Sequence, residues 1–179
     1  FYEASTPDPV PIVGLLIALI CAFIAAALGG LIFSFLTITL RANQNVTGLT
    51  LTIFGGGVAN FFGGSLNKLA GGVGQISVAA TSSAFRAATP LAGAGTAGKL
   101  FFSYGFLAYA ALVIAVVMHV FLSRSRAGLN LRAVGENPGT ADAAGINVTR
   151  SKYLATCIGA GLSGLGGLYY VMDYTKGTW

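Results

Sequence analysis

Five residues, three in one apolar stretch and two at its entrance, carry side chains suited to holding a small polar molecule. They combine amide, hydroxyl and aromatic groups, which can hydrogen-bond to a sugar or base or stack on it: Asn43, Gln44, Thr50, Phe54 and Asn60. Polar groups in apolar surroundings are costly and are therefore candidates for function. We expect these residues to line a substrate path. The alternative is structural, with the threonine hydroxyls bonded to their own helix backbone and Asn60 bonded to a neighbouring helix.

The sequence offers no arrangement for covalent catalysis or metal binding. His119 is its single histidine, and Cys21 and Cys157 both lie in apolar runs, where a buried thiol is expected and a disulfide is not. Residues 93–99 match a phosphate-binding loop, but Leu100 stands where a Ser or Thr would hold magnesium. We therefore expect no catalytic residue, no metal ligand and no cofactor bound by this chain.

The composition indicates a membrane protein. Only 8% of the 179 residues are charged and 55% are hydrophobic, whereas an ordinary soluble domain carries about 25% charged residues. Ten basic and five acidic side chains cannot keep the surface of a soluble domain of this length hydrated. The basic residues are scattered singly, without the basic stripe that nucleic-acid binding requires. These features exclude a soluble enzyme, a nucleic-acid binder and a disordered chain.

Long apolar runs predict an all-α, polytopic helix bundle that forms a single transmembrane domain in the lipid bilayer. Crossing the hydrocarbon takes about 20 mostly apolar residues. Four such spans are expected, at 12–36, 46–64, 100–122 and 153–172. Residues 65–99 are expected to be irregular, with room for an interfacial or re-entrant helix over 76–88.

Small residues recur at every fourth position in three of these spans. In lipid, such residues let helix backbones approach closely, and van der Waals packing then replaces the hydrophobic effect. In the second and fourth spans, the residues expected at helix contacts are Gly48, Gly56, Gly159, Ser163 and Gly167. The first span has the same spacing at Ala22, Ala26, Gly30 and Ser34. The three faces favour a compact bundle over separate anchors.

The loop 123–152 sets the expected orientation, because half of the ten basic residues lie in it: Arg124, Arg126, Arg132, Arg150 and Lys152. Cytoplasmic loops carry an excess of Lys and Arg, so this loop is expected in the cytoplasm. Alternation of the spans then places 41–45 on the same side, and 1–9 and 65–99 outside.

The same loop predicts a short helix. Asn137 can cap it, Pro138 suits its first turn, and Gly145 can take the left-handed conformation that ends it. A helix of about two turns on such a loop is suited to docking in the groove of a partner. The alternative is a capped helix that only connects two spans.

Four segments resemble the permease subunits of bacterial ABC importers. They are Arg-Ala-Val-Gly-Glu-Asn-Pro at 132–138, Ala-Ala-Gly-Ile-Asn-Val at 143–148, the glycine-rich run 159–167, and the stretch 40–49. The sequence is most similar to permeases for simple sugars and nucleosides, which are related to ribose and branched-chain amino-acid permeases. Those permeases have further spans at both ends, so this chain is expected to be part of one.

The resemblance implies that the loop forms a coupling helix, held in a groove of a cytoplasmic ATPase subunit. The implied coupling residues are Gly135, Glu136, Asn137, Pro138, Ala141, Ala144, Gly145 and Ile146. Glu136 and Asn137 are expected as polar contacts, and Ala141, Ala144 and Ile146 as the packing face. The implied partners are ATPase subunits that bind ATP and magnesium, a second permease subunit, identical or different, and an extracellular or periplasmic substrate-binding protein. The implied location is the bacterial plasma (inner) membrane.

Two other functions compete with an ATP-driven importer of a simple sugar or nucleoside. An ion-coupled secondary transporter would need carboxylates within the membrane or paired broken helices, and the four predicted spans contain no Asp or Glu. The other is a structural membrane subunit without a transport path. In each case the chain itself would not be an enzyme.

Overall fold

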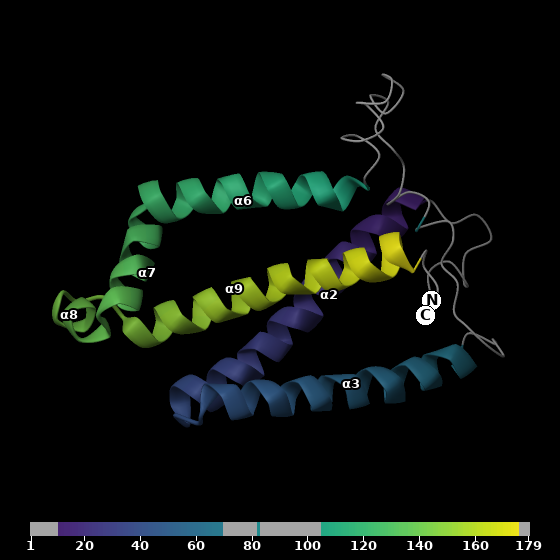
Figure 1. The fold of residues 1–179 in the computed structure, drawn as a ribbon, viewed down its shortest axis with the longest axis horizontal. Coiled ribbons are helices and arrows are strands. Elements are labelled where there is room, and N and C mark those ends of the chain that lie inside the picture. Colours follow the sequence, from purple (N-terminus) through teal and green to yellow (C-terminus); the bar gives the residue numbers. More distant parts are fainter. Residues whose placement is uncertain (1–10, 70–81, 83–104, 176–179) are drawn as a thin grey trace, which may run out of the picture. The chain divides into compact units, whose positions relative to one another are not determined.

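The computed structural model describes residues 11–69, 82 and 105–175, and within these ranges the regular structure is helical throughout. Four helices are long and apolar enough to cross a membrane (Figure 1): α2 (Pro11–Ser34), α3 (Gln44–Leu69), α6 (Phe106–Arg124) and α9 (Val148–Tyr169). A helix satisfies its backbone hydrogen bonds internally, which lipid requires. The predicted class of all-α polytopic membrane protein is confirmed.

Two of the predicted spans are lengthened in the structure by a π-helical turn. A π-helical turn, η1 (Phe35–Thr39), continues α2, and a second, η3 (Tyr170–Tyr174), continues α9. The resulting apolar segments are Ile12–Thr39, with 28 residues, and Val148–Tyr174, with 27 residues. The start of the third predicted span and nearly all of the segment 76–88 lie outside the described residues.

The prediction of a polar loop over 123–152 missed a helix, α7 (Arg126–Glu136). Ser125 caps this helix, because its hydroxyl oxygen accepts a hydrogen bond from the Gly128 amide at 2.9 Å. A Cβ at Gly128 would overlap the backbone of Phe121 and Leu122, so the sharp corner between α6 and α7 (Figure 1) requires glycine. A serine followed by an amphipathic run indicates this helix in the sequence. The high density of basic residues in the segment instead favoured the prediction of a loop.

The described chain forms two units by its internal contacts, and one of them contains a small apolar core. Leu107, at the start of α6, and Met172, in η3, are both 8% exposed and pack with half-buried side chains of α2 and α9. Ser82 is buried beside them, and its hydroxyl donates to the carbonyl oxygen of Met172 at 2.9 Å. This core joins the start of α2 and the start of α6 to the end of α9.

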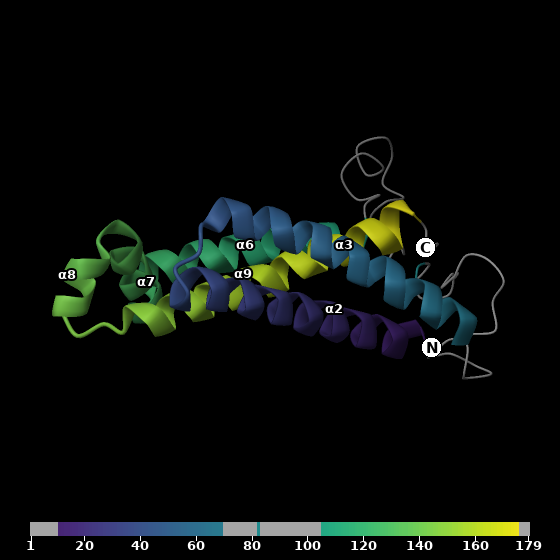
Figure 2. The same ribbon diagram turned by 90° about the horizontal axis from the view of Figure 1, so that it is seen from below.

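The other unit contains a close contact between α2 and α9, whose ribbons cross in Figure 1 and overlap in Figure 2. A Cβ at Gly30 would lie 2.5 Å from the Cβ of Ala160 and 3.2 Å from the carbonyl oxygen of Thr156. A Cβ at Gly161 would lie 2.6 Å from the ring of Phe23. Such distances leave no room for a side chain, so both glycines permit a close backbone approach.

Polar side chains reinforce this contact along α2. Ser34 is fully buried, and its hydroxyl donates to the carbonyl oxygen of Gly30 at 2.8 Å. The hydroxyls of Thr39 and Tyr153 are hydrogen-bonded at 2.5 Å, which joins η1 to the first turns of α9. Of the three small-residue faces in the sequence, the face of the first span is therefore the one that lies at a helix contact, through Gly30 and Ser34.

The other predicted packing positions have no close neighbour within the described ranges. A Cβ at Gly48, Gly56, Gly159 or Gly167 would have no atom within 4 Å, and Ser163 is exposed. The contact surface of α9 lies instead on the face of Cys157, Ala160 and Gly161. A packing role for the exposed faces stays a prediction, and it requires a surface beyond the described residues.

Alanine substitutions at adjacent glycines of α2 are expected to have opposite effects. Gly29→Ala has open space around the new methyl group and should stabilise the helix by about 0.5–1 kcal/mol. Gly30→Ala forces the new Cβ against Ala160 and should destabilise the protein by about 1–3 kcal/mol. Thermal unfolding of the purified protein in detergent measures both effects. Equal shifts for the two variants would contradict the α2–α9 contact.

Candidate functional site

The helix α8 (Pro138–Ala143) follows α7 after one residue, Asn137. The side-chain oxygen of Asn137 accepts hydrogen bonds from the amides of Gly139, at 3.0 Å, and Thr140, at 3.3 Å. Gly145 has a φ of 80°, the left-handed conformation that suits glycine after a helix. The predicted cap, first-turn proline and left-handed end are confirmed, whereas the role of α8 in coupling stays a prediction.

The predicted packing face of α8 is divided in the structure. Ala141 is 3% exposed, so its methyl group is packed within this chain. The helix α8, which contains Ala141, packs against α7. Ala144 is exposed and Ile146 is half-buried. The remaining predicted coupling residues are also exposed: Gly135, Glu136, Asn137, Pro138 and Gly145. A partner can therefore contact Ala144 and this exposed set, while Ala141 holds α8 in place.

An open hollow of about 610 Å³ lies beside α8. Its walls are formed by Pro138, Gly139, Asp142 and the residues 145–149. Asp142 is the one acidic side chain in this lining, and Ile146 and Val148 add apolar surface. A concave surface with one carboxylate can receive a protruding side chain of another protein.

The residues predicted to line a substrate path do not converge on one cavity in the described part of the chain. Asn43 caps α3, since its side-chain oxygen accepts a hydrogen bond from the Asn45 amide at 3.0 Å. The hydroxyl of Thr50 donates to the carbonyl oxygen of Val46 at 2.9 Å, as the structural alternative predicted. Phe54 is 59% exposed, and Asn60 is also exposed. A role in the substrate path stays a prediction for these residues.

A cleft of about 530 Å³, which the sequence did not predict, lies among four segments. They are the end of α2 with η1, the start of α3, the helix α7 and the start of α9. We call it the four-helix cleft, and its lining comprises Phe33, Thr37, Ile38, Arg41, Gln44, Leu131, Val134, Gly135, Val148, Thr149, Lys152, Ala155 and Thr156. Gln44 is the one predicted path residue among them.

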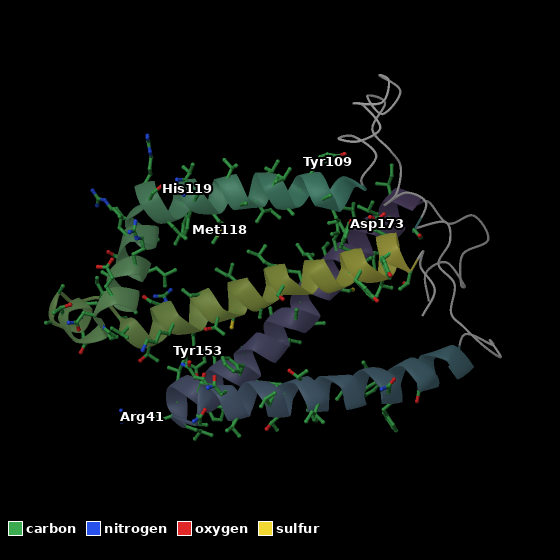
Figure 3. All side chains as sticks on the ribbon, viewed as in Figure 1. Arg41, Tyr109, Met118, His119, Tyr153 and Asp173 are labelled. Atoms are coloured by element: carbon green, nitrogen blue, oxygen red, sulfur yellow. The ribbon has the colours of Figure 1, made fainter. Side chains whose placement is uncertain are left out.

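The cleft brings the break between the first two spans next to the start of the fourth. Arg41 follows η1 with a φ of 54°, and the amide of Ala42 donates to the carbonyl oxygen of Leu36 at 3.0 Å, which closes the helix end. Figure 3 shows Arg41 just beyond η1 and Tyr153 near the start of α9. This arrangement agrees with the expectation from alternation that 41–45 and the basic loop lie on the same side of the membrane.

The histidine and the two cysteines line neither the hollow beside α8 nor the four-helix cleft. His119 lies on α6 near the corner with α7 and is exposed (Figure 3). Cys21 is exposed and Cys157 is half-buried, and both are free thiols. In the described ranges, no three His, Cys, Asp or Glu side chains are grouped closely enough to hold a metal ion.

Loss of the Asn137 cap is expected to loosen α8. Asn137→Ala leaves the amides of Gly139 and Thr140 without their acceptor, which should destabilise the helix by about 1 kcal/mol. Hydrogen–deuterium exchange of the full-length protein should then be about fivefold faster over 139–143. Asn137→Asp keeps the acceptor and should leave the exchange rate near that of the parent. Unchanged exchange in the alanine variant would show that the cap does not order α8.

Comparison with known proteins gives a consistent set of similarities. A profile of the family described as the permease component of the branched-chain amino acid transport system matches residues 4–179. The chain is 34% identical over 146 residues to a Haloferax volcanii protein named "putative glucose ABC transporter permease". That alignment covers 81% of this chain and 43% of the Haloferax protein.

Two further relatives come from bacteria. The guanosine ABC transporter permease of Bacillus subtilis is 30% identical over 167 residues, which are 90% of this chain and 51% of that protein. A nucleoside ABC transporter permease of Lactococcus lactis is 34% identical over 149 residues, which are 80% of this chain and 45% of that protein. The chain thus spans about half the length of the curated relatives it matches. No solved structure matches it.

Proposed function

Because the chain belongs to the family of permease components of branched-chain amino-acid transport systems, we propose that the full-length protein is the permease subunit of an ATP-driven importer. The match of residues 4–179 to this family, together with four membrane-length helices in the same region, carries the proposal. The proposed substrate is a simple sugar or a nucleoside, since the similar proteins are named for glucose, guanosine and nucleosides.

The proposed mechanism has no covalent step in this chain. ATP hydrolysis in a partner ATPase, which holds the nucleotide and magnesium, moves the permease between outward-open and inward-open states by rigid-body rotation. A second permease subunit and an external substrate-binding protein complete the proposed assembly. Its proposed location is the plasma membrane, with α7 and α8 in the cytoplasm, since the segment 123–152 holds half of the basic residues.

The surface of α8 is the proposed contact with the ATPase. This helix is capped, it packs against α7, and most of its residues are exposed. A displacement of α8 is passed to α7, whose corner at Gly128 leaves little room for bending against α6. On its other side, only 144–147 separate α8 from α9. Force on this short helix therefore reaches two membrane helices through short connections.

Cysteine cross-linking tests the contact with the ATPase. In full-length protein with Cys21 and Cys157 replaced by alanine, a cysteine at the exposed position Ala144 should cross-link to the co-expressed ATPase. A cysteine at the buried position Ala141 should not, because its thiol faces this chain. The two positions lie about one helical turn apart, so Ala141→Cys is a matched control for Ala144→Cys. If Ala144→Cys and every other exposed position of 135–146 fail to cross-link, the docking role is excluded.

Uptake by cells that express the complete transporter tests the substrate and the energy source. We expect uptake of labelled glucose or of a labelled nucleoside such as guanosine. Uptake should disappear when the partner ATPase carries a substitution that blocks hydrolysis, and it should persist when ion gradients are collapsed at constant ATP. Uptake that follows a proton or sodium gradient and ignores the ATPase substitution would instead indicate a secondary transporter.

A further inference from the structure

We propose that the four-helix cleft binds the phosphate group of an anionic membrane lipid. This assignment goes beyond the proposed transport function, because no step of translocation requires it. It rests on the charges in the cleft, on the hydrogen-bonding groups and apolar surface in its walls, and on its position at the ends of membrane helices.

The charge of the cleft is entirely positive. Arg41, in the connection between η1 and α3, and Lys152, on α9, both line it, and its lining contains no Asp or Glu. Glu136 follows the lining residue Gly135 but is not part of the wall. A neutral sugar or nucleoside has no charge for two cations to neutralise. A phosphate suits both, since guanidinium and ammonium groups are its usual partners in proteins.

Two polar side chains that are available for hydrogen bonding line the same cleft as the two cations. The side chains of Gln44 and Thr149 line the cleft and make no hydrogen bond within the described part of the chain. Both can donate to a phosphate oxygen. By contrast, the hydroxyls of Thr37 and Thr156 already donate to their own helix backbones, at 2.8 Å and 2.9 Å. Gln44 and Thr149 are therefore the donors that we assign to the ligand.

The conformation of Arg41 supports a binding role. Its φ of 54° is in the left-handed region, which disfavours residues with a side chain. Glycine would close the same helix end without this cost. Arginine at this position brings a guanidinium group to the cleft, although its side chain does not favour the backbone conformation.

The position of the cleft favours a lipid over a soluble phosphate. It lies where the segment Ile12–Thr39 ends and the segment Val148–Tyr174 begins, and the ends of segments long enough to cross the hydrocarbon layer are expected to reach the lipid headgroups. Apolar residues, including Phe33, Ile38 and Val148, form part of its wall and can contact the glycerol and upper acyl chain. Basic pockets between membrane helices are typical sites for anionic headgroups.

Lipid binding to the purified full-length permease tests the proposal. The probe is phosphatidylglycerol in nanodiscs of otherwise zwitterionic lipid, with phosphatidylcholine alone as the reference. The variant Arg41→Gln/Lys152→Gln should lose binding by about 10- to 30-fold, as expected from two basic contacts at the membrane surface. The charge-preserving variant Arg41→Lys/Lys152→Arg should keep most of it. Lys152→Gln alone, an exposed substitution on α9, gives an intermediate loss and covers the case in which the double variant folds poorly.

A charge-matched control separates the cleft from general surface charge. Arg124→Gln/Arg126→Gln removes two exposed basic residues that do not line the cleft, and it should bind within twofold of the parent protein. Equal losses in the two double variants would overturn the proposal, and so would no loss in Arg41→Gln/Lys152→Gln. Inorganic phosphate is the third probe. If it binds as tightly as phosphatidylglycerol, the ligand is a soluble phosphate and the lipid assignment fails.

Discussion

Close packing at Gly30 brings α2 and α9 into contact, and it does so without a hydrophobic force, because lipid supplies none between membrane helices. Contact between two such helices depends on van der Waals attraction, and this falls steeply with distance. Ser34 is buried one turn beyond Gly30, and the hydroxyls of Thr39 and Tyr153 meet further along the same two segments. The four-helix cleft is bounded by the same helix ends, so its shape depends on this contact.

The segment between α6 and α9 contains no long flexible connection. Ser125 caps α7 directly after α6, Asn137 caps α8 directly after α7, and Gly145 ends α8 shortly before α9 begins. Each joint is closed by a side-chain cap or a glycine, which are local devices. The proposed coupling to an ATPase requires this kind of connection, because a flexible loop would not transmit the motion of the partner.

Features that depend on local chemistry could be predicted from the sequence. The absence of charge over about 20 residues located the membrane helices, and Asn137, Pro138 and Gly145 predicted α8 with its ends. Features that depend on a neighbour could not. Spacing alone did not show that Gly30 meets α9 while Gly56 meets nothing described, or that Ala141 faces inward. The four-helix cleft draws on residues from Phe33 to Thr156, and no local pattern connects them.

The length of the two packed segments has a consequence for the bilayer. At a rise of about 1.5 Å per residue, a helix of 28 residues is roughly 42 Å long. The hydrocarbon layer is only about 30 Å thick. Ile12–Thr39 and Val148–Tyr174 must therefore tilt, extend into the headgroup layer, or thicken the lipid around them. Membrane thickness thus acts mechanically on the same pair of helices that Gly30 holds in contact.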